Sequence, residues 1–391
     1  MSIKKKAVIV MPSYNEREGI KLLIPEIFSL AKNIENWTIE ILIVDDNSPD
    51  GTADEVKKLQ KEYPKSLHLL KGKKEGLGRA YVRGFAYAIE HLQPYVLFEM
   101  DADGQHPSSL IPSFLKKIES GSDFVIGSRY VQGGSIPENW TIDRKFYSIV
   151  GSLVAQLGFM NFKVKDWTSG FRCIKASFLN DVLNEMRNHN GYVFQIALLD
   201  KAFKRHLHIG EVPLNFVDRL NGESKFSSIQ FIMDALMYIL VESSFVRFAF
   251  VGGMGFLVDF GFAALFIHSF NIFKPTANAF SAELAIIFNF FINNYWSFKH
   301  KQIKTSILQQ LLKFNVVSSG SIFMQWYGMK LALETFGDHI ISQPFSFVEL
   351  HSWVIYKIII IACFIIPYSY VMYNAFIWKS PTHVDNDMQG A

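Results

Sequence analysis

The sequence predicts an α/β domain with a mostly parallel sheet, followed by an α-helical membrane domain with four spans. The first part rests on residues 7–130, where short apolar runs alternate with helical stretches. The second rests on long apolar segments between residues 246 and 379. A hydrophobic fraction of 49% and a mean hydropathy of +0.15 fit a chain with one soluble and one membrane part. Its 391 residues suffice for two or three domains.

Composition excludes several classes of protein. The net charge of +3 gives no indication of a nucleic-acid partner. Cys173 and Cys363 lie far apart, without the spacing of a disulfide framework or a metal site. The start of the chain, MSIKKKAVIVMP, has an apolar run too short for a signal peptide, and we expect it to be the first strand.

The expected sheet is built from five apolar runs separated by helical stretches near 16–33, 51–62, 76–92 and 108–119. Strands that alternate with helices form βαβ units, and ligands bind at the carboxyl ends of such strands. The polar residues just after each run are therefore the candidates for a shared cleft. The runs are Ala7–Met11, Ile39–Val44, Leu67–Leu70, Tyr95–Met100 and Phe124–Ile126.

The stretch YVLFEMDADGQHPSSL, residues 95–110, ends an apolar run in two aspartates. By itself it reads as an acidic turn. Asp101, Asp103 and Gln105 would point the same way in an extended chain, and their oxygen atoms suit Mg²⁺ or Mn²⁺ beside a nucleotide diphosphate. Asp46, after the second strand, could accept hydrogen bonds from a nucleobase or ribose. The segment GKKEGLGRA, 72–80, matches neither a P-loop nor a dinucleotide fingerprint, which argues against kinases and dehydrogenases.

Four apolar segments are long enough to cross a bilayer core of roughly 30 Å. Lysines cluster after the second and fourth segments, at Lys299, Lys301, Lys304, Lys313 and Lys379. By the positive-inside rule, these loops, the N-terminal domain and the C-terminus face the cytoplasm. The segments are Phe248–Phe270, Thr276–Trp296, Phe314–Leu333 and Trp353–Trp378.

Two further stretches, 145–164 and 226–245, are apolar but too interrupted to span a membrane. Such helices either lie in the membrane interface or pack in the soluble core, and the sequence leaves both open. The expected domains are 1–225, an interface helix over 226–245, a membrane domain over 246–379 and a cytoplasmic tail over 380–391.

Eight motifs occur in order along the chain, namely MPSYNERE (11–18), IVDDNSPDGT (43–52), GLGRAYVRGF (76–85), DADGQHP (101–107), GSRYVQGGS (127–135), DWTSGFRCIK (166–175), GYVFQIALL (191–199) and EVPLNFVDRLNGESKF (211–226). Together they resemble the polyprenyl-phosphate sugar transferases of glycosyltransferase family 2, in particular the dolichol-phosphate mannose synthase group. The resemblance covers about residues 7–230. Two further motifs lie in the tail, FVRFAFVGGMGFLVDFGF (245–262) and NFFINNYWSF (289–298), and through them the tail resembles a GtrA-like four-span domain.

The resemblance implies a GT-A fold and assigns roles to individual residues. The nucleoside of a GDP-sugar would be held by Pro12, Tyr14, Glu16, Val44 and Asp46. The diphosphate and the metal, Mg²⁺ or Mn²⁺, would be met by Asp101, Ala102 and Asp103, with Gln105 as a further metal ligand. The sugar-phosphate and lipid-phosphate groups would be met by Arg129, Arg144, Arg219 and Lys225. Catalysis would depend on Asp103, Arg129 and Arg144.

One departure concerns the residues after the second aspartate. Many dolichol-type members have an apolar residue and a serine there, where this chain has Gly104 and Gln105. The sequence DGQHP is commoner among the wider bacterial relatives, so the resemblance leaves the sugar open. His106 is expected to be a turn residue.

The chemistry of one segment also favours a phosphate acceptor. Family members that glycosylate hydroxyls need a general base, usually an acidic pair at the place that DWTSGFR occupies in this chain, which has only Asp166 there. A lipid monophosphate has a second pKa near ~6 and needs no base, but it needs cations, for which arginine is suited. The expected reaction is a single displacement with inversion, helped by positioning and charge stabilisation.

The sequence therefore predicts a metal-dependent enzyme that transfers mannose from GDP-mannose to a polyprenyl (dolichyl) phosphate. It would be a multi-pass protein in contact with membrane lipid, and a homo-oligomer is compatible with it. One alternative is a glucosyl or other hexosyl transferase that uses a UDP-sugar. Another is a translocator of lipid-linked sugars.

Overall fold

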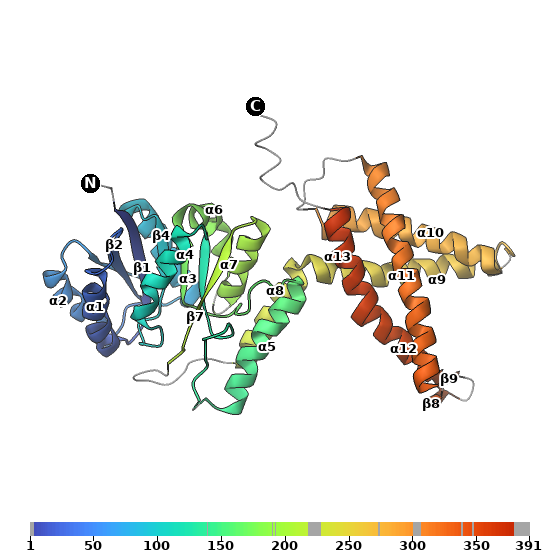
Figure 1. The fold of residues 1–391 in the computed structure, drawn as a ribbon, viewed down its shortest axis with the longest axis horizontal. Coiled ribbons are helices and arrows are strands. Elements are labelled where there is room, and N and C mark those ends of the chain that lie inside the picture. The colour runs from blue at the N-terminus through green and yellow to red at the C-terminus, as the bar shows by residue number, and fades with distance from the viewer. Residues whose placement is uncertain are drawn as a thin grey trace. The chain divides into compact units, whose positions relative to one another are not determined.

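The computed structural model describes residues 4–138, 140–189, 191, 193–217, 228–272, 274–299, 306–337, 339–345 and 348–378. The chain divides into two compact units, an α/β unit over Met1–Ile239 and a helical unit over Leu240–Ala391 (Figure 1).

The α/β unit is built around one sheet of seven strands. The strands are β1 Lys5–Ser13, β2 Trp37–Asp45, β3 Leu67–Lys71, β4 Val96–Glu99, β5 Phe124–Ser128, β6 Arg172–Lys175 and β7 Ile209–Pro213. Their order is β3-β2-β1-β4-β6-β5-β7, with β3, β2, β1 and β4 parallel to one another. β6 runs antiparallel between β4 and β5, and β7 pairs in parallel with β5.

All five predicted strands are present, and the sheet is mostly parallel as expected. Strands β6 and β7 were not predicted from the sequence pattern. Their sequences, RCIK and IGEVP, are short and mix apolar with polar residues, so neither forms an apolar run. β6 pairs with both β4 and β5, so the sheet is mixed at this point.

Helices cover both faces of the sheet. On one face α1 and α4 pack over Ala7, Ile9 and Met11 of β1, as part of one apolar core. On the other face α3 lies so close that a Cβ at Gly84 would be 2.6 Å from Val10 Cγ1 and 2.8 Å from Val44 Cγ2. The helices are α1 Arg17–Ala31, α2 Thr52–Glu62, α3 Leu77–Tyr87, η1 Ala88–Leu92, η2 Ser108–Leu110, α4 Ile111–Glu119, α5 Ile142–Phe159, α6 Ala176–Met186, α7 Val193–Lys204 and α8 Ser228–Glu242.

The loop after β2 caps the start of α1. The Glu16 N–H donates to Thr52 Oγ1 at 3.2 Å, and the Arg17 N–H donates to Asp50 Oδ2 at 3.1 Å. These bonds satisfy backbone donors that the first turn of a helix cannot satisfy itself. They also hold the loops after β1 and β2 together.

A buried ion pair lies under the carboxyl end of β4. Arg172 and Glu99 are both fully buried, and Arg172 Nε is 3.8 Å from Glu99 Oε2. The guanidinium also donates to the carbonyl oxygens of Ser169 at 2.8 Å, Gln195 at 2.8 Å and Trp167 at 3.1 Å. Arg172 therefore joins the segment that follows residue 166 to helix α7.

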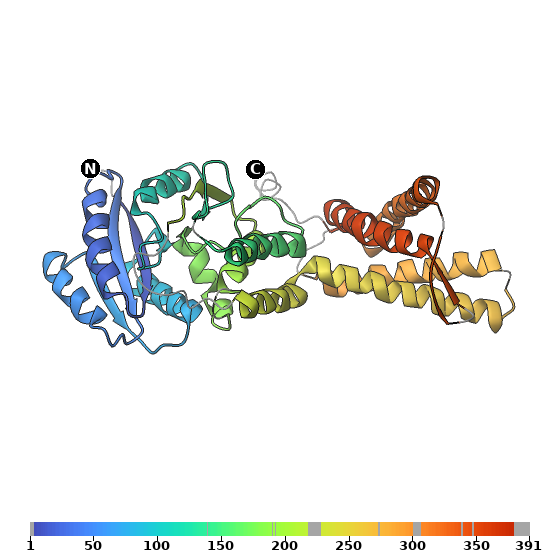
Figure 2. The ribbon, with the colours of Figure 1, turned by 90° about the horizontal axis from the view of Figure 1, so that it is seen from below.

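The helical unit contains a helix in each of the four predicted apolar segments. Its first two helices, α9 and α10, run side by side (Figures 1 and 2), and Ser281 Oγ of α10 donates to Asp259 Oδ1 of α9 at 2.6 Å. A hairpin of β8 and β9 was not predicted. The elements are α9 Ser244–His268, α10 Lys274–Ile292, η3 Asn293–Ser297, α11 Ile307–Phe336, β8 Ile340–Phe345, β9 Val348–His351, α12 Ser352–Ile360, η4 Ile361–Ile365 and α13 Ile366–Phe376.

Among the residues that the structure describes, no individual helix combines the length and the apolar character needed to cross a membrane. The consecutive pair Ile232–Glu242 and Ser244–Asp259, bent by 66°, meets both requirements jointly. The number of four spans, the membrane orientation and the domain boundaries remain predictions.

The buried Glu99 predicts a pH dependence of stability. Burial raises the pKa of Glu99 to about 7, against the opposing charge of Arg172. In the unfolded chain the carboxyl group ionises near pH 4.5, so between these values the folded state binds more protons. The free energy of unfolding should therefore fall as the pH rises from about 4.5 to about 7, by up to ~3 kcal/mol. Denaturant unfolding of Glu99→Gln should lack this slope, whereas the exposed control Glu62→Gln should keep it. Equal slopes in both variants would contradict the assignment.

Candidate active site

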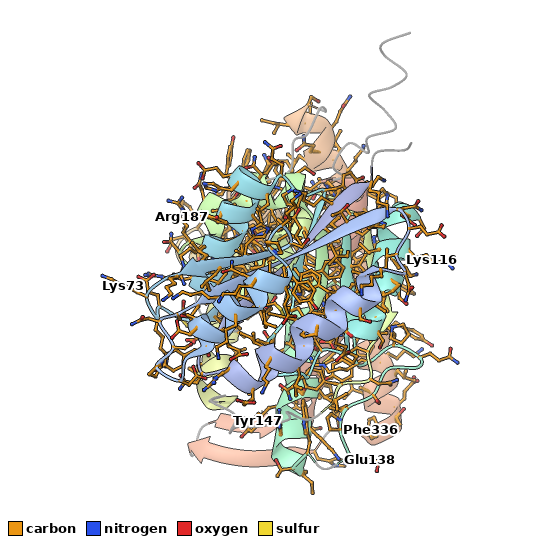
Figure 3. The ribbon with its side chains drawn as sticks, turned by 90° about the vertical axis from the view of Figure 1, so that its left-hand side faces the viewer. Lys73, Lys116, Glu138, Tyr147, Arg187 and Phe336 are labelled. Carbon is orange, nitrogen blue, oxygen red and sulfur yellow. The ribbon has the colours of Figure 1, made fainter. Side chains whose placement is uncertain are left out.

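The candidate site lies at the carboxyl ends of β1, β2, β4 and β5, where the predicted residues gather. On the β2 side, Asp46 forms an ion pair with Arg83 of α3, with its Oδ1 in contact with Arg83 Nη2. Burial raises the pKa of Asp46 in spite of the arginine charge. Arg83 Nη1 also donates to the carbonyl of Lys73 at 3.4 Å. Lys73 lies in the loop between β3 and α3 (Figure 3). The Lys74 ammonium lies 3.5 Å from the centre of the Tyr14 ring.

Sequence reasoning missed Arg83. Its motif, GLGRAYVRGF, is part of the resemblance, but nothing in the spacing indicates that a helical arginine reaches the end of β2. Of the other predicted nucleoside residues, Pro12 and Val44 are register partners of β1 and β2. The Val44 side chain is fully buried towards Gly84, so this residue could meet a ligand only through its backbone.

The turn that contains Asp101 and Asp103, called the DxD turn below, follows β4. Asp103 and Gln105 are buried, and the Gln105 N–H donates to Asp103 Oδ1 at 3.1 Å. Gln105 Nε2 lies 3.4 Å from the carbonyl oxygen of Val217, so the amide is oriented by this contact. Asp101 is more accessible, with 33% of its side chain exposed. The turn therefore presents one accessible and one buried carboxylate.

These residues fit a hard divalent cation. Two carboxylates and an amide oxygen are ligand types that Mg²⁺ and Mn²⁺ prefer. In the described part of the chain, no cluster of three or more His, Cys, Asp or Glu side chains could hold a metal by itself. An ion at Asp101 and Asp103 would therefore be completed by other ligands, as is usual for Mg²⁺ at diphosphates.

Tyr81 and His106 form hydrogen bonds that orient Asp101. The Tyr81 hydroxyl donates to Asp101 Oδ1 at 3.2 Å, and burial, reinforced by the Asp101 charge, raises the Tyr81 pKa well above its usual range. The Asp101 N–H donates to His106 Nδ1 at 3.0 Å. Burial lowers the pKa of His106 to about 4, so the ring is neutral and carries its proton on Nε2.

His106 thus has a defined role that the sequence did not indicate. Its ring is buried and stacks on Phe171 at 4.9 Å with an interplanar angle of 10°. It is more than a turn residue, because it accepts the backbone N–H of the first aspartate. A histidine in a polar turn gives no sequence signal for such a contact.

Glycines shape the same turn. A Cβ at Gly19 would lie 2.3 Å from the carbonyl oxygen of Ala102, so only glycine lets α1 approach this closely. Gly104 has φ +80°, a conformation that glycine adopts without strain. The backbone thus gives a physical reason for glycine where many dolichol-type relatives have an apolar residue.

Arg129, at the end of β5, is fixed by Asp166. Its Nε and Nη2 donate to the two carboxylate oxygens at 2.7 Å each, and its N–H donates to Oδ2 at 3.0 Å. Nη2 also donates to Thr168 Oγ1 at 2.7 Å. Although burial opposes ionisation, the Arg129 charge holds the pKa of Asp166 below its usual range. Asp166 is therefore an ionised partner of an arginine, which makes it a poor general base.

Aromatic side chains connect the two predicted catalytic arginines. The Arg144 guanidinium lies 3.9 Å from the centre of the Trp140 ring, and Trp140 meets Phe216 edge-on at 5.5 Å. The Arg129 guanidinium is 5.7 Å from the same Phe216 ring. Phe216 also meets His106 at 5.9 Å, which connects this group with the DxD turn. Arg219 and Lys225 lie outside the described residues.

Helix α5 borders this region with one polar and one apolar face. Ser148 bonds the Tyr130 hydroxyl at 2.6 Å, Ser152 approaches Thr168 at 3.4 Å, and Gln156 Nε2 donates to the Lys165 carbonyl at 2.9 Å. The other face does not pack in the core of the α/β unit. It carries exposed apolar side chains, namely Ile142, Phe146, Ile149, Leu153 and Leu157.

Comparison with known proteins identifies the family. Residues 8–186 match glycosyl transferase family 2, and residues 247–378 match the transmembrane domain of the GtrA/DPMS type. Dolichol-phosphate mannosyltransferase of Pyrococcus furiosus is 35% identical over 327 residues, which cover 81% of this chain and 88% of that protein. The chain therefore belongs to glycosyl transferase family 2. It is a glycosyltransferase with a GtrA/DPMS membrane domain.

Two further relatives match a smaller share of the chain. Undecaprenyl-phosphate mannosyltransferase of Micrococcus luteus is 36% identical over 57% of this chain and 88% of that protein. Polyprenol monophosphomannose synthase of Mycolicibacterium smegmatis is 33% identical over 57% of this chain and 82% of that protein. A solved glucosyl-3-phosphoglycerate synthase from Mycobacterium tuberculosis with Mn²⁺ and UDP-glucose is 18% identical over 60% of this chain and 79% of that chain, with a TM-score of 0.45.

The pairing of Asp166 with Arg129 predicts a positioning role for this acid. Asp166→Asn keeps the shape but loses the charge, and ionic hydrogen bonds of this kind contribute roughly 1.5–3 kcal/mol. We expect kcat for glycosyl transfer to fall roughly 10- to 100-fold, with a nearly unchanged KM for the nucleotide sugar. The exposed Asp181→Asn serves as the control. Wild-type turnover in Asp166→Asn would show that Arg129 does not depend on this partner.

Proposed function

We propose that the protein transfers mannose from GDP-mannose to a polyprenyl phosphate, which gives polyprenyl-phosphate mannose and GDP. The proposal rests mainly on the Arg129–Asp166 pair. In this pair Asp166, the only acid of the segment DWTSGFR, is engaged by an arginine. The site has oriented cations, and its acid is already paired with an arginine. Such a site suits an acceptor that is an anion when it binds. The names of the three relatives agree with this acceptor class and this sugar.

The reaction would be a single displacement. The acceptor phosphate is largely deprotonated at neutral pH, since its second pKa is near ~6. Its oxygen attacks the anomeric carbon of mannose, while the bond between that carbon and the β-phosphate oxygen breaks. GDP leaves with the electron pair, and the configuration at the anomeric carbon inverts. Neither bond change requires an enzyme base to remove a proton.

The arginines would bring two anions together. Arg129 is held with two of its nitrogens on Asp166, and Arg144 rests on Trp140, so both guanidinium groups are oriented before the acceptor binds. Preoriented cations stabilise phosphate without reorganisation during the reaction. We assign the acceptor phosphate to this pair, with Arg219 and Lys225 as further cations.

The nucleotide would bind across the ends of β1, β2 and β4. Asp46 with Arg83, together with Tyr14 and Glu16, forms the nucleoside end. Asp101, Asp103 and Gln105 would hold Mg²⁺ or Mn²⁺, which offsets charge on the diphosphate when bound.

The acceptor lipid would reach this unit from the membrane surface. The exposed apolar stripe of α5 has the pattern of an interfacial helix, and its polar face contacts residues 130, 165 and 168 of the site. α8 also exposes Met233 and Met237, and its Tyr238 hydroxyl donates to Asp200 Oδ2 of α7 at 2.8 Å. We infer a multi-pass protein whose catalytic unit lies on the cytoplasmic face, with four spans in the GtrA/DPMS domain.

A transfer assay tests the proposed function. Purified protein, polyprenyl phosphate and Mn²⁺ or Mg²⁺ are combined with radiolabelled GDP-mannose, UDP-glucose or GDP-glucose. We expect labelled lipid from GDP-mannose alone, and a loss of at least about a hundredfold in Asp103→Ala, since a metal-binding carboxylate is removed. Turnover of UDP-glucose without turnover of GDP-mannose would show that the donor is UDP-glucose and not GDP-mannose. Undiminished activity of Asp103→Ala would remove the metal assignment.

The α5 stripe predicts a selective defect. Replacing both Ile149 and Leu153 by Asn removes two apolar contacts, each worth roughly 1.5–3 kcal/mol on full burial. Activity on polyprenyl phosphate in vesicles should fall at least about tenfold, while activity on a short, water-soluble prenyl phosphate should persist. Leu22→Asn, at an exposed position of α1, is the control. An equal loss with both acceptors would point to damaged folding instead.

A further inference from the structure

Asp101, the first aspartate of the DxD turn, is restrained by contacts with Tyr81 and His106. Tyr81 of α3 donates from its Oη to Asp101 Oδ1 at 3.2 Å. His106 fixes the backbone of the same residue through the Asp101 N–H at 3.0 Å. His106 Nε2 lies 3.9 Å from Asp101 Oδ2, the second carboxylate oxygen. Side chain and backbone are thus held by two different elements.

Tyr81 itself has little freedom to move. It is fully buried, and its ring stacks on Phe85 at 5.6 Å and on Phe194 at 6.0 Å, with interplanar angles of 29° and 10°. Phe194 belongs to α7, so rings from two helices fix the tyrosine. A Cβ at Gly78 of α3 would be 2.5 Å from the His189 carbonyl, so α3 is tightly held at this end.

The same helix also serves the nucleoside end of the site. Arg83, two positions after Tyr81, pairs with Asp46 at the end of β2. α3 therefore contacts the candidate nucleoside residue through Arg83 and the candidate metal residue through Tyr81. A rigid element with contacts to both would set the spacing of the two subsites.

We propose that Tyr81 is a positioning residue, whose hydroxyl orients the Asp101 carboxylate for the divalent cation and the nucleotide diphosphate. The proposal rests on the metal assignment of the proposed function. The ring packing and the hydroxyl have separate roles: the ring supports the fold through Phe85 and Phe194, and the hydroxyl aims the carboxylate. Removal of the hydroxyl alone should therefore leave the fold intact and weaken the response to metal.

The test compares nucleotide binding with and without metal. The dissociation constant of GDP is measured by calorimetry for the full-length protein in saturating Mn²⁺ and in EDTA. For Tyr81→Phe we expect the Mn²⁺-dependent gain in affinity to fall about tenfold, as for loss of a hydrogen bond to a charged group. Affinity in EDTA should stay within about twofold of the wild type, with an unchanged melting temperature. Tyr87→Phe, on the same helix and stacked on His91, is the matched control.

The outcomes are distinguishable. An unchanged Mn²⁺ gain in Tyr81→Phe overturns the proposal, and so does an equal loss of affinity in Mn²⁺ and EDTA, which indicates a structural role. If GDP binding by the wild type does not respond to Mn²⁺, the metal assignment itself fails and the Tyr81 proposal fails with it. A parallel series with UDP shows whether the nucleotide, and not the metal, is the wrong part of the proposed function.

Discussion

The arrangement of the site depends on one buried ion pair, between Arg129 at the end of β5 and Asp166 in the segment before β6. Asp166 is fully buried, and loss of one partner of such a pair typically costs roughly 3–5 kcal/mol because a charge is left uncompensated. The pair decides the chemistry as well as the geometry. An acid that holds an arginine with both oxygens is unsuited to remove a proton, and the proposed function therefore uses an acceptor that supplies its own negative charge.

A second constraint is that contacts from several elements hold the residues of the site in place. Arg172 donates hydrogen bonds to three backbone carbonyls, those of residues 167, 169 and 195. Helix α3 contacts Asp46 through Arg83 and Asp101 through Tyr81. Helix α5 holds the Arg129 region from its polar face and exposes apolar side chains on the other. Residues from distant parts of the sequence are therefore oriented by packing before any ligand binds, which suits a reaction driven by positioning.

The sequence predicted the features that local pattern determines. Apolar runs gave the first five strands, and the rule that ligands bind at their carboxyl ends led directly to Asp46, Asp101 and Arg129. It could not predict contacts that depend on packing. Arg83 and Tyr81 lie on a helix, and their partners are known only once α3 is placed against the sheet. β6 contains a fully buried arginine, so it lacks the apolar pattern of a central strand, and His106 gave no sign of its bond to a backbone amide.

Under the proposed function, this site glycosylates an anion and does not activate an alcohol. The decisive measurement supplies the enzyme with GDP-mannose and either a polyprenyl phosphate or the corresponding polyprenol of equal length. Because Asp166 is paired with Arg129 and is a poor base, we expect labelled product from the phosphate and none above background from the alcohol. Transfer to the polyprenol at a comparable rate would mean that the enzyme does provide a general base, and would contradict this account.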